Sequence, residues 1–337
     1  MKKKFRIAAM NATPVFMDLD ATVSKAVDII EQAAKEGAEL IGFPEAFFPG
    51  YPIWLWVSGS NCWDKFTALL WKNAVTIPGP AVSRLSEAAR KNNMYVCASV
   101  TELDGHSLYL TQLWFDRNGN LIGKHRKIRP TGTERCLWGE GDGSTMAVFE
   151  TDLGRVGGLH CWEHMMPINH MAMAAQCEEI HVASWGSSFY DPQSAHHFDT
   201  YRIATAYYSM AVGCYSILSA TPMTDEILEF VSEGDPAKKN LFQPGFGGGG
   251  CIYSPEGRVI ATPPDPHKEG LVVAEVDMDA LPLHHYQLDI AGHYSKPGVY
   301  NINFDRRPQR PVNFIGDVTD YSLPYEVLQN KGTDAAL

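Results

Sequence analysis

The sequence predicts an α/β fold in which helices cover either one mixed sheet or two packed sheets. Short apolar runs, which suit buried strands, alternate with longer segments whose apolar residues recur every three or four positions, as in amphipathic helices. Two further stretches turn back on themselves as hairpins and so add antiparallel strands. The 337 residues are 45% hydrophobic and 20% charged, which is ordinary for a globular protein and allows a large core.

The first part of the chain alternates strand and helix. Residues 5–11 predict an opening strand, and 20–36 predict a helix that Gly37 is placed to end. Asn118-Gly119 lies between two apolar runs, which is typical of a hairpin turn. The other expected elements are a strand at 38–43, a helix carrying Val82, Leu85, Ala88 and Ala89, a strand at 94–100, and hairpin strands at 107–115 and 120–125.

The second part continues the alternation and then loses it. From about Leu283 the chain is rich in Pro, Asn and Arg and has little apolar periodicity. We therefore predict one domain over 1–282 and a C-terminal extension over 283–337 that acts as an assembly arm. The expected elements are strands at 155–161 and 178–185 around a helix rich in Met and Ala, a helix at 201–212, a strand at 214–220, a hairpin at 250–262 turning at 255–257, and a strand at 270–276.

Charge and composition exclude several classes of protein. The net charge of -11 disfavours general binding to nucleic acid or to anionic membranes, and the basic cluster 123–129 is too short to reverse this. The basic N-terminus resembles a signal peptide, but Asn11, Thr13 and Pro14 break its apolar part. No run of about 18 apolar residues predicts a membrane span. Seven scattered cysteines suit reduced thiols and predict a cytoplasmic location.

Three charged or nucleophilic side chains stand just past expected strands. Glu45 follows AELIGFP, Lys127 follows NLIGKHR, and Cys161 ends RVGGLHC. Active sites in open α/β sheets form where strands end, so these three groups could converge.

Cys161 lies where a strand gives way to a helix. An ordinary thiol is mostly protonated at neutral pH, so a nucleophilic cysteine needs a helix N-terminus, a nearby cation or a base to activate it. The alternative is a buried, inert cysteine, which fits Cys97 within MYVCASV better. Of the neighbouring histidines, strand alternation points His160 away from Cys161, whereas His164 stays possible as its partner.

The charged candidates have ordinary alternatives too. Glu45 is one carboxylate amid apolar and aromatic residues, where burial would raise its pKa toward that of a general base; it could also be the first glutamate of a helix. Lys127 lies in a run of cations and could belong to a solvated basic face. Glu134 could orient Lys127 or pair with Arg135 on the surface.

Other kinds of site are not indicated. The chain has no H-E-x-x-H or C-x-x-C metal motif and no papain-like cysteine motif. The pairs His196-His197 and His284-His285 are poor joint ligands, because neighbours in a strand face opposite sides. The glycine-rich stretch 245–251 lacks the Lys-Ser/Thr of a P-loop and fits a turn better. We expect neither a metal nor an organic cofactor.

Six segments together resemble the nitrilase (carbon-nitrogen hydrolase) superfamily. In chain order they are FPEAFFPGYP, GKHRKIRPT, ERCLWGEGDG, GGLHCWEH, HVASW and GHYSKP, and they span Phe43 to Pro297. The resemblance implies a four-layer αββα sandwich, with 1–282 as its nitrilase domain. It also implies pairing through helices into dimers, which often build spiral oligomers or filaments. Trp162 after the cysteine is similar to the true nitrilase branch, which includes microbial nitrilases, arylacetonitrilases and cyanide dihydratases.

The resemblance also implies roles for particular residues. Glu45, Lys127 and Cys161 match a Glu-Lys-Cys catalytic triad, and Glu134 matches a second glutamate near it. His293 matches a motif that is associated with activity in microbial nitrilases.

Aromatic residues near these motifs predict an apolar substrate wall, although each could equally be a core aromatic. Gly186 departs from the pattern, because similar enzymes often have Pro after the Trp of HVASW, and this bears on the shape of the wall. The candidate substrate-binding residues are His293 together with Tyr51, Trp54, Trp56, Trp162 and Trp185.

The expected activity is hydrolysis of an organic nitrile to a carboxylic acid and ammonia, through a thioimidate and an acyl-enzyme on Cys161. A covalent nucleophile and an ammonium group suffice for this chemistry. The alternatives are a cyanide-degrading nitrilase, whose motifs look much the same, and an amidase. A catalytically dead scaffold that assembles filaments is a further alternative, which the intact Glu, Lys and Cys argue against.

Overall fold

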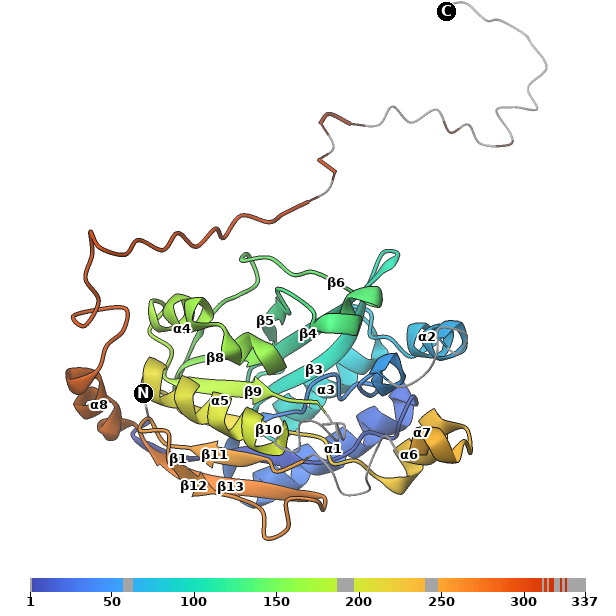
Figure 1. Ribbon diagram of the computed structural model, residues 1–337, viewed down its shortest axis with the longest axis horizontal. Helices are drawn as coiled ribbons and strands as arrows, with labels where there is room; N and C mark the ends of the chain where they lie inside the picture. The colour runs from blue at the N-terminus through green and yellow to red at the C-terminus, as the bar shows by residue number, and fades with distance from the viewer. Residues whose placement is uncertain are drawn as a thin grey trace, which may run out of the picture. The chain divides into compact units, whose positions relative to one another are not determined.

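The computed structural model describes most of the chain (Figure 1). The chain divides into two compact units, Met1–Arg307 and Pro308–Leu337, and both sheets belong to the first. The described residues are 2–56, 63–186, 197–239, 248–310, 312–313, 315–317, 322 and 325, with only the backbone described at 63 and 197–199. His196 and residues 245–247 of the expected glycine turn lie outside these ranges.

The first sheet has seven strands in the order β13-β1-β2-β3-β4-β5, with β6 paired to β4. Strands β1, β2 and β3 are parallel neighbours, whereas β13, β4 and β5 add antiparallel pairs. The strands are β1 (Lys4–Asn11), β2 (Ala38–Gly42), β3 (Tyr95–Asp104), β4 (Ser107–Phe115), β5 (Leu121–Arg126), β6 (Trp138–Gly139) and β13 (Gly270–Asp277).

The second sheet has six strands in the order β12-β11-β10-β9-β8-β7. Its centre is parallel, and its two edges are closed by antiparallel strands. The strands are β7 (Phe149–Thr151), β8 (Gly154–His160), β9 (Ile180–Ser184), β10 (Tyr215–Ser219), β11 (Cys251–Tyr253) and β12 (Val259–Ala261).

The two sheets pack face to face over a shared apolar core. Ile7 and Leu40 of the first sheet share one buried cluster with Val182 and Ile217 of the second. The approach is close, because a Cβ on Gly158 of β8 would lie 2.5 Å from Oε1 of Gln112 on β4 of the first sheet. Since each fully buried aliphatic side chain contributes roughly 1.5–3 kcal/mol, this interior holds the sheets together.

Helices cover the outer faces of both sheets and complete the expected αββα sandwich. Helices α1 (Leu19–Lys35) and α3 (Pro80–Lys91) pack on the first sheet, and α4 (Pro167–Ala174) and α5 (His197–Val212) pack on the second (Figure 1). The prediction of an α/β fold with outer helices is confirmed. The sequence left open whether there is one mixed sheet or two packed sheets, and the structure has two.

Local signals account for the ends of α1. Asp18 caps its N-terminus by accepting a hydrogen bond from the backbone N–H of Ala21, and Gly37 follows its C-terminus at a φ of 82°.

The predicted hairpin at Asn118-Gly119 is also confirmed, because β4 and β5 are antiparallel neighbours. The predicted strand 155–161 ends one residue early, since Cys161 leaves the extended conformation with a φ of 44°.

Four α-helices within the described part of the chain were not expected from the sequence. They are α2 (Trp63–Lys72), α6 (Asp225–Ser232), α7 (Pro236–Lys239) and α8 (Leu281–Gln287). Helix α8 spans the predicted domain boundary after Pro282, and His284 in it donates to the carbonyl oxygen of Met210 on α5. That boundary stays a prediction. Among the described residues, no helix is both long and apolar enough to cross a membrane.

Candidate active site

Loops that follow strands of both sheets carry the candidate catalytic residues. Glu45 follows β2 and Lys127 follows β5, both in the first sheet, while Cys161 follows β8 in the second. The Nζ atom of Lys127 donates to Oε1 of Glu45 at 2.9 Å and to Oε2 of Glu134 at 2.8 Å. The structure therefore brings Glu45, Lys127 and Glu134 into one buried ion cluster, and the charges of all three act on the Cys161 thiol.

Glu45 lies in a turn and does not begin a helix, so the helix-start alternative is wrong. Its backbone N–H donates to the carbonyl oxygen of Trp185, which follows β9, and this bond ties the turn to the second sheet. Burial raises the pKa of Glu45 to about 7, an effect that the positive charge of Lys127 limits and the negative charge of Glu134 reinforces. This carboxylate can therefore take a proton near neutral pH.

One oxygen of Glu45 is left open. Oε1 accepts from Lys127, whereas the buried Oε2 has no hydrogen-bond partner among the described residues. Gly186 lies beside it: a Cβ at this position would come 3.0 Å from Oε2 and 3.2 Å from the ring of Tyr51. The glycine that departs from the sequence pattern therefore keeps space free next to the candidate base.

Lys127 is buried and does not belong to a solvated basic face. Burial alone would lower its pKa, but the carboxylates of Glu45 and Glu134 raise it well above the ordinary value, so the amine stays charged. Its neighbours behave differently, because Lys124 and Arg126 both bind Glu102 on β3 and are partly exposed. Strand alternation separates these two kinds of cation along one run of sequence.

Glu134 contacts Lys127, which is the contact that one of its two sequence interpretations requires. It lies in a short 3-10 helix, Gly132–Cys136, where its Oε2 accepts from the backbone N–H of Thr131 at 2.6 Å as well as from Lys127. Its Oε1 accepts from the hydroxyl of Tyr51 at 2.6 Å. The surface pairing with Arg135 is not observed, because Nε of Arg135 donates to the carbonyl oxygen of Pro130.

Cys161 occupies a strained turn between β8 and a 3-10 helix, Cys161–Met165. Its φ of 44° is left-handed, which costs a residue other than glycine about 1–3 kcal/mol, and such strain is often found at active sites. The residue as a whole is partly exposed, whereas its sulfur is buried. Burial of the sulfur and the charge of Glu45 raise the pKa of the thiol, while Lys127 and the backbone N–H of Trp162 lower it. The balance keeps the resting thiol protonated, so it requires a base.

Glu163 is a buried residue of the candidate site that sequence reasoning missed. One oxygen accepts from the backbone N–H of His160 and from Nε2 of His125, both at 2.9 Å, and the other accepts from the backbone N–H of Ile128 at 2.8 Å. A single carboxylate thus fixes the residue before Cys161 relative to the residue after Lys127. The spacing His160-x-x-Glu163 is that of a capping box and was the available signal.

His164 is not the partner of the Cys161 thiol. Its Nδ1 faces the carbonyl oxygen of Cys161 at 2.6 Å, and its Nε2 faces Nε2 of His181 at 2.9 Å. Both ring nitrogens are therefore engaged elsewhere, and the sequence-based alternative of a Cys-His pair is wrong.

The predicted wall residues fall into two groups. Tyr51 bonds Glu134, and Trp185 stacks between His164 and Tyr201 with ring centroids 5.3 and 4.9 Å away. Both therefore lie at the site, although the polar atom of each is already engaged, since Nε1 of Trp185 donates to Thr205.

The other predicted wall residues are a core aromatic, a partner of Tyr51 and two exposed side chains. Trp54 is fully buried and packs on the ring of Phe66 with centroids 5.3 Å apart, which fits its alternative as a core aromatic. Trp56 donates from Nε1 to the hydroxyl of Tyr51. Trp162 is 41% exposed, and His293 is exposed in the segment after α8.

One group of side chains has the composition of a metal site. Ligand atoms of His125, His160 and Glu163 lie within 4.8 Å of one another, all buried. Both oxygens of Glu163 already accept backbone N–H groups, so this cluster is explained by hydrogen bonding within the protein.

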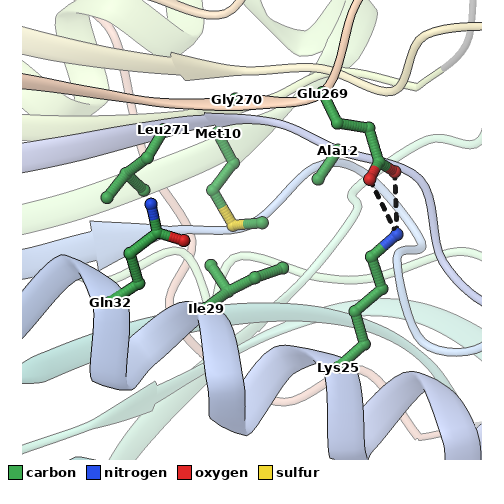
Figure 2. A pocket seen from close by; sticks show the side chains of 8 residues that line it. All are labelled: Met10, Ala12, Lys25, Ile29, Gln32, Glu269, Gly270 and Leu271. Carbon is green, nitrogen blue, oxygen red and sulfur yellow. Dashed lines mark hydrogen bonds and ion pairs between the residues drawn. The ribbon is translucent and has the colours of Figure 1, made fainter.

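A pocket of about 250 Å³ lies away from these residues, between α1 and the strands β1 and β13 (Figure 2). Met10, Ile29 and Leu271 form its apolar part, and an ion pair between Lys25 and Glu269 stands at one side. No candidate catalytic residue lines it.

Comparison with known proteins places the chain in a family. The carbon-nitrogen hydrolase family matches residues 6–283. A nitrilase from Bacillus sp. (strain OxB-1) is 43% identical over 328 residues, which cover 97% of this chain and 95% of the relative. An aliphatic nitrilase from Rhodococcus rhodochrous is 40% identical, with 92% and 85% covered. The chain therefore belongs to the carbon-nitrogen hydrolase family, and within it to the nitrilase branch.

Solved structures support the same fold. A carbon-nitrogen hydrolase from Helicobacter pylori G27 superposes with a TM-score of 0.67 at 16% identity, covering 85% of this chain and 93% of that one. A variant of the amidase from Nesterenkonia sp. AN1 has a TM-score of 0.62 at 18% identity, with 85% and 97% covered. That amidase was solved with the acetamide moiety of fluoroacetamide added covalently at its active-site cysteine.

Proposed function

We propose that the protein hydrolyses organic nitriles to the carboxylic acid and ammonia, with Cys161 as nucleophile, Glu45 as general base and Lys127 as charge stabiliser. The observation that carries this proposal is the buried ammonium of Lys127, held between two carboxylates and acting electrostatically on the thiol. The nitrilase relatives support the substrate class, and the covalent adduct of the Nesterenkonia amidase supports a cysteine nucleophile.

The chemistry begins with the thiol proton. Glu45 takes it, the sulfur forms a bond to the nitrile carbon, and the nitrile nitrogen receives a proton to give a thioimidate. Glu45 then helps a water molecule to add to the same carbon, and the tetrahedral intermediate expels ammonia to leave a thioester. A second water molecule releases the carboxylic acid and restores the thiol. The balance is RCN + 2 H₂O → RCOOH + NH₃.

The geometry supports a distinct proposed task for each charged residue. The unpaired Oε2 of Glu45 is the oxygen available for a proton, because Lys127 occupies Oε1. The ammonium of Lys127 faces the negative charge that develops as the sulfur attacks, and in a buried site this stabilisation is stronger than in water. Glu134 holds the ammonium in place and does not itself need to touch the substrate.

We further propose that the aromatic wall favours a nitrile over the matching amide. A nitrile is linear and has no N–H groups, whereas an amide presents two N–H donors that need acceptors. The hydroxyl of Tyr51 and Nε1 of Trp185 are already engaged in hydrogen bonds, so this wall offers few acceptors for the N–H groups of an amide. Each unpaired polar group costs about 1–3 kcal/mol. Trp162 and His293 are proposed as more distant contributors to substrate binding.

The proposed substrate preference is tested with a panel of four compounds. We expect kcat/KM for phenylacetonitrile to exceed that for phenylacetamide by at least about tenfold, which corresponds to one unpaired polar group. Burial of a phenyl-sized group, worth about 1.5–3 kcal/mol, should also place phenylacetonitrile above cyanide, with a small aliphatic dinitrile as the fourth compound. Ammonia and acid are both measured. A faster amide would indicate an amidase, and cyanide as the best substrate would indicate a cyanide-degrading enzyme.

We also propose that the protein is a cytoplasmic homo-oligomer built from dimers into a spiral or filament. The outer surface of α4, α5 and the 3-10 helix before them carries exposed apolar side chains, from 41% exposed for Trp162 to 67% for Ile203. Apolar surface of this kind marks contact sites, and the same face on two copies can pair symmetrically. The patch comprises Trp162, Met165, Met166, Ile168, Ile203, Tyr207 and Met210.

The oligomer is tested by light scattering after size exclusion. We expect a mass above that of a dimer for the unaltered protein and a clear loss of mass for Ile203→Asp, which puts a charge into the patch. Trp71→Asp is the matched control, since Trp71 is also a large exposed apolar side chain but lies on α2. Removing 308–337 tests the proposed assembly arm. A monomer at every protein concentration would contradict the proposal.

A further inference from the structure

A row of buried polar side chains lies behind the nucleophile, and the mechanism proposed above does not use it. Oε1 of Glu178 lies 2.8 Å from Nδ1 of His181, and Nε2 of His181 lies 2.9 Å from Nε2 of His164. Nδ1 of His164 lies 2.6 Å from the carbonyl oxygen of Cys161. All three side chains are 1% exposed or less. The row leads from β9 to the backbone of the candidate nucleophile.

The positions of the hydrogens in this row follow from its end point. A carbonyl oxygen has no hydrogen, so Nδ1 of His164 must carry one. Burial lowers the pKa of both histidines well below the ordinary value, so each ring is neutral and has a single N–H. Nε2 of His164 is then an acceptor, and Nε2 of His181 must donate to it. That leaves Nδ1 of His181 as an acceptor, which requires Glu178 to be the donor.

Glu178 fits the role of a donor. Burial raises its pKa to about 8, so near neutral pH it is a carboxylic acid with one O–H. Its other oxygen accepts from the hydroxyl of Tyr208 at 2.5 Å, which leaves Oε1 to carry the proton. Every donor in the row therefore points toward Cys161.

The peptide group at the end of the row is the one that faces the thiol. Its carbonyl belongs to Cys161 and accepts from His164, and its N–H belongs to Trp162 and lowers the pKa of the Cys161 thiol. Because a peptide group is planar, holding the oxygen fixes the direction of the N–H. The φ of 44° at Cys161 is strained, so this orientation needs support from outside the turn.

We propose that Glu178 and His181 are positioning residues for the nucleophile, because they set the His164 tautomer that holds the Cys161–Trp162 peptide with its N–H facing the sulfur. The inference rests on the proposed role of Cys161 and deepens it. The side chain of Trp185 stacks on His164 with an interplanar angle of 24° and keeps its ring in this orientation.

Other titratable groups around the row set the background for any pH dependence. His170 on α4 faces the carbonyl oxygen of His164, and Cys214, which precedes β10, acts on Tyr208 and on Glu178. Among the described residues, the groups that act on the row are Tyr208 on α5, His170 on α4, Cys214 before β10, His125 on β5, His160 at the end of β8 and Glu163 in the 3-10 helix.

The test compares two substitutions of Glu178. Glu178→Gln keeps a donor for His181 and an acceptor for Tyr208 but cannot ionise, whereas Glu178→Leu has no donor. We expect kcat to fall about tenfold to a hundredfold in Glu178→Leu with little change in KM, which is the range for a misplaced catalytic group. Glu178→Gln should keep kcat within about threefold of the unaltered enzyme, a much smaller loss than that expected for Glu178→Leu. Circular dichroism and thermal unfolding check that both variants fold.

The pH dependence of activity is a second readout, and it would not change if Glu178 only stabilised the fold. Glu178 is protonated below its folded pKa and ionised above it, so the donor is present below about pH 8 and lost above it. The unaltered enzyme should therefore lose activity above this pH, and Glu178→Gln should not. Tyr208→Phe removes a hydrogen bond that favours the ionised carboxylate, so it should move the same loss to higher pH. This milder variant serves if Glu178→Leu does not fold.

The rate at which iodoacetamide alkylates Cys161, followed by mass spectrometry of its peptide, separates this inference from the proposed function. The rate should fall in Glu178→Leu and be retained in Glu178→Gln even if no nitrile is turned over. A Gln variant as impaired as the Leu variant would show that an ionised Glu178 is required and would overturn the donor assignment. Unchanged alkylation and turnover in Glu178→Leu would show that the row does not position the nucleophile.

Discussion

Cys161→Ala is expected to abolish turnover while the protein stays folded. The bond to the nitrile carbon cannot form without the sulfur, and removing the nucleophile of a catalytic unit costs a factor on the order of 10⁶ in kcat. The residue as a whole is partly exposed and the substitution removes one sulfur atom, so the free energy of unfolding should change little. Ammonia release and thermal unfolding, measured on the same preparation, check both parts.

Cys97→Ala is the matched control. Cys97 is fully buried on β3, and burial raises the pKa of its thiol, so it is an inert core residue. Its replacement should lower stability by about 0.5–1.5 kcal/mol, as for other small losses of buried volume, and leave kcat unchanged. Near-normal kcat in Cys161→Ala would show that another group is the nucleophile.

The sequence predicted those elements that bury one face and carry their own start and stop signals. Helix α1 was predicted within one residue at each end, because its apolar stripe, the Asp18 cap and Gly37 all agree. The choice between one sheet and two could not be made, since strand pairing joins distant residues such as Lys4 and Asp277. Helix α8 was missed for a similar reason: its stability comes from packing, with Leu281 in the core between the sheets.

Those candidate site residues that directly follow a strand could be predicted from the sequence. Glu45, Lys127 and Cys161 each follow a strand, and the sequence placed all three. It could not show the partners of Glu163 or Glu178, because those lie on other elements: Ile128 follows β5, and Tyr208 lies on α5. A glutamate near a strand end looks the same in the sequence whether it is a surface residue, a buried acid or a link between two loops.

Lys127→Ala is expected to lower kcat/KM by about 10²–10³, the usual loss when one donor that stabilises transition-state charge is removed. The substitution also leaves Glu45 and Glu134 buried without their cation. Breaking a buried ion pair from one side costs about 3–5 kcal/mol, so the variant should unfold at a lower temperature, and activity is measured well below that temperature.

The pH profile of Lys127→Ala gives a second expected result. In the unaltered protein the pKa of Glu45 is about 7, so the basic form is available above this pH and lost as the pH falls through it. Lys127 lowers the pKa of Glu45, and its removal therefore raises that pKa. The acid side of the profile should move to higher pH in the residual activity.

Lys124→Ala is the matched control for charge and sequence position. Lys124 is partly exposed and pairs with the buried Glu102 of β3, which Arg126 also binds, so its loss should cost at most about 1 kcal/mol of stability and leave kcat/KM nearly unchanged. The difference between two lysines three residues apart is what distinguishes a placed catalytic ammonium from a general positive face. Comparable losses of activity in both variants would contradict the assignment of Lys127, because a diffuse field does not depend on which lysine supplies the charge.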